Sequence, residues 1–97
     1  MKRTWPHLYQ CPNRPRADVY EHERFGTKVG VLDTDASWFI CWTRGARHSG
    51  GNDIWYYTRG DRTARRPELQ AWGYVPAVEL YTDRHPAPEV TRECPKG

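Results

Sequence analysis

The sequence predicts an all-β fold, a small antiparallel barrel of five or six short strands with proline-rich terminal arms. Three observations support this prediction. Short aromatic and apolar stretches recur between turn-rich segments, and none shows the period of a helix. Eight glycines and eight prolines among 97 residues favour turns over long helices. Closing the sheet into a barrel would remove the exposed edges of its apolar strands.

The aromatic content indicates how so polar a chain builds a core. Only 37% of the residues are hydrophobic, but five Trp, six Tyr and two Phe are present. Each large ring can bury about 150–250 Å². A small barrel cannot enclose all of these rings, so we expect some on the surface as an interaction site. The length suits one domain, with an N-terminal arm over 1–7, a barrel over 8–82 and a C-terminal tail over 83–97.

Two candidate strands lie near the N-terminus. Residues 8–11 form a short apolar stretch that Pro12 interrupts, and residues 17–20 alternate between apolar and polar side chains. Either stretch can be the first barrel strand, so the register of residues 8–25 stays open. Residues 21–24 are charged and form a loop that ends at Phe25 and Gly26.

The middle of the chain contains two more strands. In residues 27–32, Thr27, Val29 and Val31 share one face because side chains alternate along a strand. Asp and Ser residues at 33–37 indicate a turn. Residues 38–42 are apolar on both faces, which predicts a central strand covered on both sides. Strict alternation puts Trp38, Ile40 and Trp42 on one face of this strand, and Phe39 and Cys41 on the other.

The last two strands follow long loops. The glycine-rich residues 44–53 suit a wide hairpin connection to a strand at 54–58. In this strand, Ile54 and Tyr56 lie on the face opposite to that of Trp55 and Tyr57. The loop at 59–71 contains one predicted helical turn, 67–70, because Pro suits a first helical position. The final strand covers 72–76. Pro76 cannot donate a ladder hydrogen bond, so the strand ends there or lies on an edge, and Val78 and Leu80 then close the core.

A family resemblance appears at this point. Over about residues 8–82, the chain resembles a bacterial Src-homology-3-like (SH3-like) domain. The resemblance lies in the stretch from Gly26 to Leu32, a turn, Trp38-Phe39, and then Gly73-Tyr74-Val75-Pro76 with a closing apolar residue. The chain is also similar to small exported actinobacterial proteins of this class. This second similarity lies in residues 38–42 and 54–57 and in a cysteine within a proline-rich C-terminal segment. The loops 44–53 and 59–71 are longer than the family norm. Glu79 stands where peptide-binding eukaryotic relatives usually have Tyr.

The resemblance implies a non-enzymatic module that binds cell-wall peptides or serves in targeting. Trp38 and Pro76 match groove positions of the family, and Glu21 and Glu23 resemble the acidic loop that meets basic ligand residues. Rings near the closing strand extend this set. The predicted ligand-binding surface therefore comprises Trp38, Trp55, Trp72, Tyr74 and Pro76, with Glu21 and Glu23 at its rim. Its partner would be an extended peptide, a cell-wall fragment or another protein.

The charge pattern allows a second kind of partner. A net charge of +3 is too small to imply nucleic-acid binding by itself. The excess is local, because four arginines fall within eight residues: Arg59, Arg62, Arg65 and Arg66. They form either a solvated loop or a patch for an anionic partner, and a polymer-binding role through this loop and nearby rings is a third functional hypothesis.

Three cysteines are an odd number, so not all of them can pair within the chain. Cys41 and Cys94 are the main disulfide candidates, since their bond would attach the tail to the central strand. Closing a loop of about 50 residues could stabilise the fold by about 4 kcal/mol. A Cys11–Cys94 bond would tie the two ends together instead. Three reduced thiols in a cytoplasmic protein are the other alternative.

The sequence predicts no metal site, no cofactor and no enzymatic activity. His7 and Cys11 are four residues apart and Cys41 and His48 are seven apart, and neither is a zinc-site spacing. Cys41 lies in an apolar strand without the basic surroundings of a catalytic thiolate. Acidic residues at 33 and 35 lie on a turn, where Asp is expected for conformational reasons.

Location and assembly have several possible answers. No apolar run approaches the ~20 residues that span a membrane, and the N-terminal residues lack the apolar region of a signal peptide. A secreted or cell-envelope protein whose signal is absent from this chain is expected, with cytoplasm or virion as alternatives. In the alternative function, a structural subunit of a virion or secreted complex, arms at 1–16 and 82–97 contact neighbouring copies and form oligomers.

Overall fold

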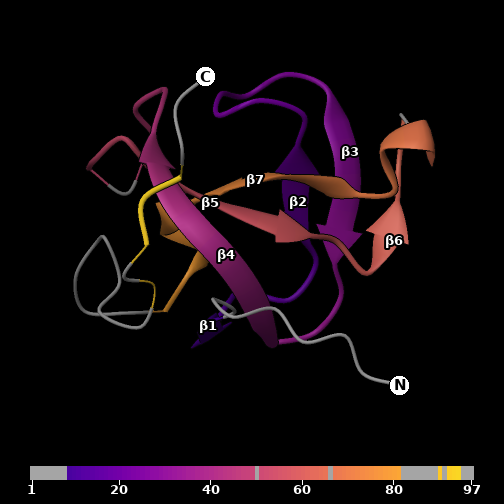
Figure 1. Ribbon diagram of the computed structural model, residues 1–97, viewed down its shortest axis with the longest axis horizontal. Coiled ribbons are helices and arrows are strands. Elements are labelled where there is room, and N and C mark those ends of the chain that lie inside the picture. Colours follow the sequence, from indigo (N-terminus) through magenta and orange to yellow (C-terminus); the bar gives the residue numbers. More distant parts are fainter. Residues whose placement is uncertain (1–8, 50, 66, 82–89, 91, 95–97) are drawn as a thin grey trace.

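The computed structural model describes residues 9–49, 51–65, 67–81, 90 and 92–94, and these form an all-β structure (Figure 1). Seven strands and two one-turn 3-10 helices follow one another along the chain. The strands are β1 (Tyr9–Pro12), β2 (Ala17–Tyr20), β3 (Lys28–Leu32), β4 (Ala36–Arg44), β5 (Ile54–Arg59), β6 (Arg62–Thr63) and β7 (Trp72–Pro76). The helices are η1 (Pro67–Leu69) and η2 (Ala77–Glu79).

All seven strands belong to one antiparallel sheet with the order β1-β4-β5-β7-β2-β3-β6. Strand β7 lies between β5 and β2, so it joins the β4–β5 hairpin to the β2–β3 hairpin (Figure 1). The sheet is not closed, because no ladder within the described residues joins β1 to β6. The prediction of an antiparallel all-β fold is therefore confirmed, and barrel closure is not.

A short link returns the chain from η2 to β1. Asn13 forms an isolated antiparallel bridge with Leu80. The amide of Arg14 donates to the carbonyl of Glu79 at 2.7 Å, and that of Tyr81 donates to Pro12 at 2.9 Å. These bonds place the residues after η2 beside the end of β1.

The predicted elements agree closely with the observed ones. Strands at 17–20 and 72–76 have the predicted bounds, and η1 occupies the predicted helical turn. Both N-terminal candidates are strands, β1 and β2, so neither excludes the other. Strand β6 was not predicted, since two exposed polar residues carry no alternation. The predicted N-terminal arm at 1–7 and most of the predicted tail at 83–97 lie outside the described residues. In the longer arm at 1–16 of the alternative function, residues 9–12 belong to the sheet as β1.

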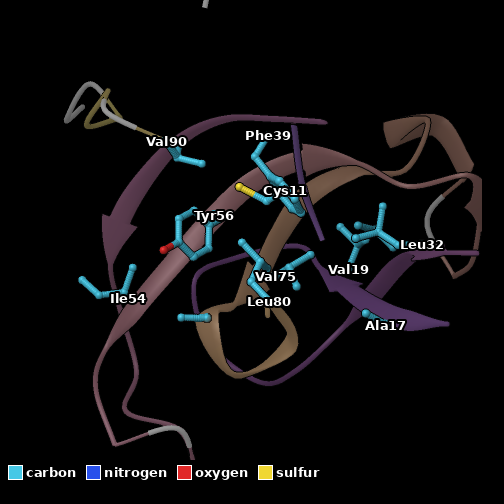
Figure 2. Packing of buried hydrophobic residues seen from close by; sticks show 12 residues of the cluster. Cys11, Ala17, Val19, Leu32, Phe39, Ile54, Tyr56, Val75, Leu80 and Val90 are labelled. Carbon is cyan, nitrogen blue, oxygen red and sulfur yellow. The ribbon is translucent and has the colours of Figure 1, made fainter. Parts of the chain in front are cut away.

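The core lies on one side of β5 and β7. Phe39 and Tyr56 meet edge-on with their ring centroids 5.8 Å apart, and Figure 2 shows them with Val75 and Leu80 near the centre of the cluster. Leu80 is 4% exposed and belongs to the core, whereas Val78 is only partly buried and does not, so the predicted closing pair is confirmed for Leu80 alone. The fully buried or nearly buried members are Cys11, Ala17, Val19, Val29, Leu32, Phe39, Ile54, Tyr56, Val75, Ala77, Leu80 and Val90.

Strand β4 differs from its prediction in two ways. It is not covered on both sides, because the Trp38 side chain is 52% exposed. Its pairing with β5 also shifts register between Phe39 and Cys41. A bulge of this kind adds one residue and reverses the alternation beyond it. Trp42 consequently packs against the core, although strict alternation put it on the face of Trp38.

A register shift between β2 and β3 has a similar effect. The shift lies between Val19 and Tyr20 of β2. On β3, Val29 and Leu32 belong to the core whereas Val31 is only partly buried. The prediction that Thr27, Val29 and Val31 share one face is therefore wrong, because the irregular pairing interrupts the period of two and puts Val29, but not Val31, in the core.

A disulfide fixes the described part of the C-terminal tail. Cys41 bonds to Cys94, with their Cα atoms 4.9 Å apart. The amide of Trp42 donates to Arg92 at 2.9 Å, and that of Cys94 donates to Trp42 at 2.7 Å. This segment runs beside β4 in Figure 1. The Cys41–Cys94 prediction is confirmed over both alternatives, and Cys11 is buried and takes no part in a disulfide.

Candidate ligand-binding surface

The register of β5 and β7 defines a surface on the side away from the core. Directly opposed residues share a face of a sheet. The opposed pairs on this side are Tyr57 with Tyr74, Arg59 with Trp72, and Trp55 with Pro76. Neighbouring strands extend it, because Cys41 opposes Tyr57 and Tyr20 opposes Tyr74. We call this side of β4, β5 and β7 the outer face.

Three rings at the middle of the outer face contact one another. Tyr57 stacks on Trp72 with centroids 5.5 Å apart and planes at 18°, and it meets Tyr74 at 5.1 Å and 55°. All three side chains are only partly buried. Burial raises the pKa of the Tyr57 hydroxyl. Burial, then the Glu23 carboxylate and Tyr57, raise the pKa of Tyr74, so both hydroxyls stay neutral and able to donate hydrogen bonds.

A pocket of about 370 Å³ opens at one end of these rings. Trp38 and Ile40 of β4 and Trp72 of β7 supply apolar lining, while Arg59 and Asp61 supply the charges. Trp38 is the most exposed of these rings, at 52%. The pocket therefore joins Trp38 to the ring group of Tyr57, Trp72 and Tyr74.

Arg59 is held in place at this pocket. Its Nε donates to the carbonyl of Gln70 at 3.1 Å, and its guanidinium carbon lies 5.9 Å from the centroid of the Trp72 ring. The latter distance suits a cation–π contact. Gln70 and Ala71 have φ values of 54° and 66°, left-handed conformations that cost about 1–2 kcal/mol each in L-residues. This strained turn presents the carbonyl that orients Arg59.

The opposite end of the outer face is covered. Trp55 is 0% exposed, and its Nε1 donates to the carbonyl of Ala46 at 2.8 Å. The rings of Tyr20, Phe25 and His48 surround it with centroids at 5.9, 5.1 and 6.0 Å. Pro76, its partner on β7, is also buried. These two predicted binding residues thus contribute no accessible surface, because loops 21–26 and 44–53 close over them.

The predicted acidic rim lies in the first of these loops. Glu21 and Glu23 are both partly buried. The backbone carbonyl of Glu23 accepts a hydrogen bond from the Ala46 amide at 3.0 Å, which joins the two covering loops. The Glu23 carboxylate contributes to the raised pKa of Tyr74, after burial, so its negative charge acts on the group of exposed rings.

The clustered arginines that the structure describes have different neighbours. Arg62 makes two bonds to the Asp33 carboxylate, of 2.7 and 2.9 Å, and this contact lowers the pKa of Asp33. Arg65 lines a different, shallow pocket together with Lys28. Arg59 lies on the outer face, and Arg66 lies outside the described residues.

Sequence reasoning missed two members of the surface. The period of two correctly put Tyr57 on the same face as Trp55. Nothing in the local sequence indicated that Trp55 would be covered by loops and Tyr57 left accessible. Arg59 was grouped with its sequence neighbours. Its place beside Trp72 depends on the pairing of β5 with β7, which the sequence alone does not reveal.

No family model, curated protein or solved structure matches this chain. Within the described residues, His, Cys, Asp and Glu side chains form no group of three or more that could hold a metal ion. No helix in that part of the chain is long and apolar enough to cross a membrane.

Proposed function

We propose that this protein is a non-enzymatic binding module of SH3-like architecture that recognises an extended peptide or a cell-wall fragment. The observation that supports this most is the row of accessible rings on three adjacent strands: Trp38, Tyr57, Trp72 and Tyr74. Tyr and Trp give large contact areas at a low cost in side-chain entropy. Their hydroxyl and indole groups add hydrogen bonds that orient a ligand.

The path of the chain around β7 supports the SH3-like part of the proposal. The Gly73-Tyr74-Val75-Pro76 motif occupies β7, and η2 leads directly to the buried Leu80. The bridge from Leu80 to Asn13 then brings this end of the chain back to β1. Two hairpins joined through β7, with the end of the chain returned to the first strand, suit a small, partly open barrel.

The charges at the two ends of the ring row support an extended ligand. At one end the Glu23 carboxylate contributes to the raised pKa of Tyr74, so negative charge acts on this ring, and at the other end Arg59 lies beside Trp72. A ligand that crosses the rings would thus meet opposite charges at its two ends, which fixes its direction. Stacking on prolines or sugar rings would occur between them.

The disulfide bears on where such a module works. Disulfides persist in oxidising surroundings and are rare in the cytosol. The Cys41–Cys94 bond is therefore consistent with an extracellular or cell-envelope location, which is where cell-wall fragments occur.

Titration with soluble cell-wall fragments and proline-rich peptides, followed by tryptophan fluorescence, tests the proposal. We expect a saturable shift, and at least about ten-fold weaker binding for Trp38→Ala and Tyr74→Ala, since ring truncations at hot spots cost about 2 kcal/mol or more. Tyr81→Ala is the matched control, because Tyr81 is 54% exposed, close to Trp38 at 52%, but lies after η2. No shift at millimolar ligand, or equal losses in all three variants, would contradict the proposal.

A further inference from the structure

The pocket beside Trp38 holds one cationic and one anionic side chain that do not pair with each other. Arg59 and Asp61 both line its space of about 370 Å³. Within the described residues, neither takes part in an ion pair, although ion pairs occur nearby, as between Arg62 and Asp33. Because opposite charges attract, other contacts must keep these two side chains apart.

Arg59 is held by neutral groups and keeps donors available. Its Nε bonds to Gln70 and its plane lies near Trp72. In the part of the chain that the structure describes, its terminal nitrogens donate to no other group. A guanidinium offers parallel N–H donors in the geometry of a carboxylate. Arg59 can therefore receive a carboxylate without losing the contacts that position it.

Asp61 is held in a similar way by backbone amides. Its Oδ2 accepts bonds from the amides of Asp33 at 2.7 Å and Thr34 at 3.3 Å, which stabilise the turn between β3 and β4. No described group donates to its Oδ1. The nearby cation Arg62 is bound to Asp33 instead. Asp61 thus has one oxygen that can accept a bond from an ammonium group.

The remaining walls suit a small ligand with both charges. Trp38, Ile40, Leu32 and Trp72 supply apolar surface, and charge pairs are stronger where such surface excludes water. A volume of about 370 Å³ is near the lower end of the range for ligand sites. It fits one or two small residues at the end of a longer ligand.

We propose that this pocket binds a zwitterionic amino-acid group, with its carboxylate on Arg59 and its ammonium on Asp61. The inference rests on the proposed function, since it names the chemical group that the ligand presents at the Trp72 end of the outer face. In a longer ligand this group is a residue joined through its side chain, because such a residue keeps both its ammonium and its carboxylate. A ligand with both charges satisfies the two side chains, whereas a simple anion or cation satisfies one and is repelled by the other.

Blocked and free amino acids test the pocket directly. The ¹⁵N-labelled protein is titrated at constant ionic strength with alanine and alanylalanine, and with the N-acetylated and C-amidated forms of each. We expect the indole N–H signals of Trp38 and Trp72 to shift with at least one free zwitterion. Blocking either charge of that ligand should weaken binding at least about ten-fold, the effect of losing roughly 1.4 kcal/mol. Equal binding of free and blocked forms, or no shift at these indoles, would overturn the proposal.

Variants assign the two charges. Arg59→Gln should abolish the preference for ligands with a free carboxylate. Asp61→Asn should abolish the preference for ligands with a free ammonium, and its side-chain oxygen can still accept the hydrogen bond from the Asp33 amide. Arg65→Gln is the control, because Arg65 is exposed in the same segment but does not line this pocket. If either pocket variant no longer gives the dispersed amide spectrum of a folded protein, the comparison of free and blocked ligands on the unaltered protein still tests the proposal.

The outcome separates this inference from the proposed function. Longer peptides or cell-wall fragments that bind the outer face equally well with free and blocked ends would refute the zwitterion site and leave the binding module standing. Alanine or alanylalanine binding in the pocket, with no longer ligand bound, would support the site and refute the module.

Discussion

The two ends of the outer face carry the same kind of residue and have different roles. At one end, Trp55 of β5 is fully buried beneath Tyr20, Phe25 and His48. At the other end, Trp72 lines an open pocket. Both rings stand on adjacent strands of the same sheet and on the same side of it. What differs is the loop above each one.

This difference shows that burial of a ring here is decided by connections and not by strand position. Loops 21–26 and 44–53 bond to each other through Glu23 and Ala46 and cover Trp55. The turn that precedes β7 instead uses its Gln70 carbonyl to hold Arg59 beside Trp72. The covered end contributes stability, and the open end presents the rings for binding. Four predictions follow from this contrast, from the largest effect on stability to the smallest.

Replacing Trp55 should be far more damaging than replacing Trp38. Trp55→Ala leaves a cavity under two loops, and removal of a buried Trp costs about 3–5 kcal/mol of unfolding free energy. Trp38→Ala removes an exposed ring and should change stability by less than about 0.5 kcal/mol. Urea denaturation measures both. Similar losses for the two variants would mean that the ends do not differ as described.

The disulfide holds the described part of the tail against β4. Exchanging Cys41 and Cys94 together for Ser removes a link across 53 residues and should cost about 2–4 kcal/mol. Val90, which is fully buried, would lose its tether to β4. Without reductant, the denatured natural protein should show one titratable thiol, from Cys11. Three thiols would contradict the disulfide.

Separating the two covering loops should expose Trp55. A Cβ at Gly45 would clash with the backbone carbonyl of Glu23, so Gly45→Ala forces the loops apart at a cost of about 1–3 kcal/mol. Tryptophan emission should shift to the red as water reaches Trp55. Gly26→Ala is the control, since a Cβ there meets no atom within 4 Å. If the two variants behave alike, the loop contact does not control the burial of Trp55.

Alkaline pH should weaken the fold through the open end. Burial raises the pKa of Tyr57 and Tyr74 above the ordinary value of 10.0. The unfolded chain therefore loses these protons first, so the stabilisation is complete below about pH 10 and is lost as the pH rises through the folded pKa values. Urea midpoints from pH 8 to about 11.5 measure the decline. The decline of the urea midpoint with pH should be shallower in Tyr57→Phe. An unchanged slope would show that ionisation of Tyr57 does not cause the decline.

Local patterns accounted for most of the strands and for much of the candidate surface. Alternation and turn residues placed β2 and β7 at their observed bounds, and the glycine-rich loop at 44–53 is the hairpin connection expected. The closing residue Leu80 and the Cys41–Cys94 bond were also predicted. Trp38, Trp72 and Tyr74 belonged to the predicted surface and lie on the outer face. Apart from the disulfide, which was inferred from the position of Cys94 in the tail, each of these predictions depends on residue type or on spacing within a short stretch.

The tertiary structure decided everything that depends on distant segments meeting. Bulges in the β4–β5 and β2–β3 pairings moved Trp42 toward the core and left Val31 partly exposed, and no local sequence signal marks them. Contacts between loops and strands far apart in the chain cover Trp55. Such contacts also give Arg59 and Arg62 different partners. Side-chain alternation within a regular stretch of strand is local geometry, so the sequence alone predicts it wherever no bulge intervenes. Which ring is covered depends on non-local packing, and only the folded chain determines it.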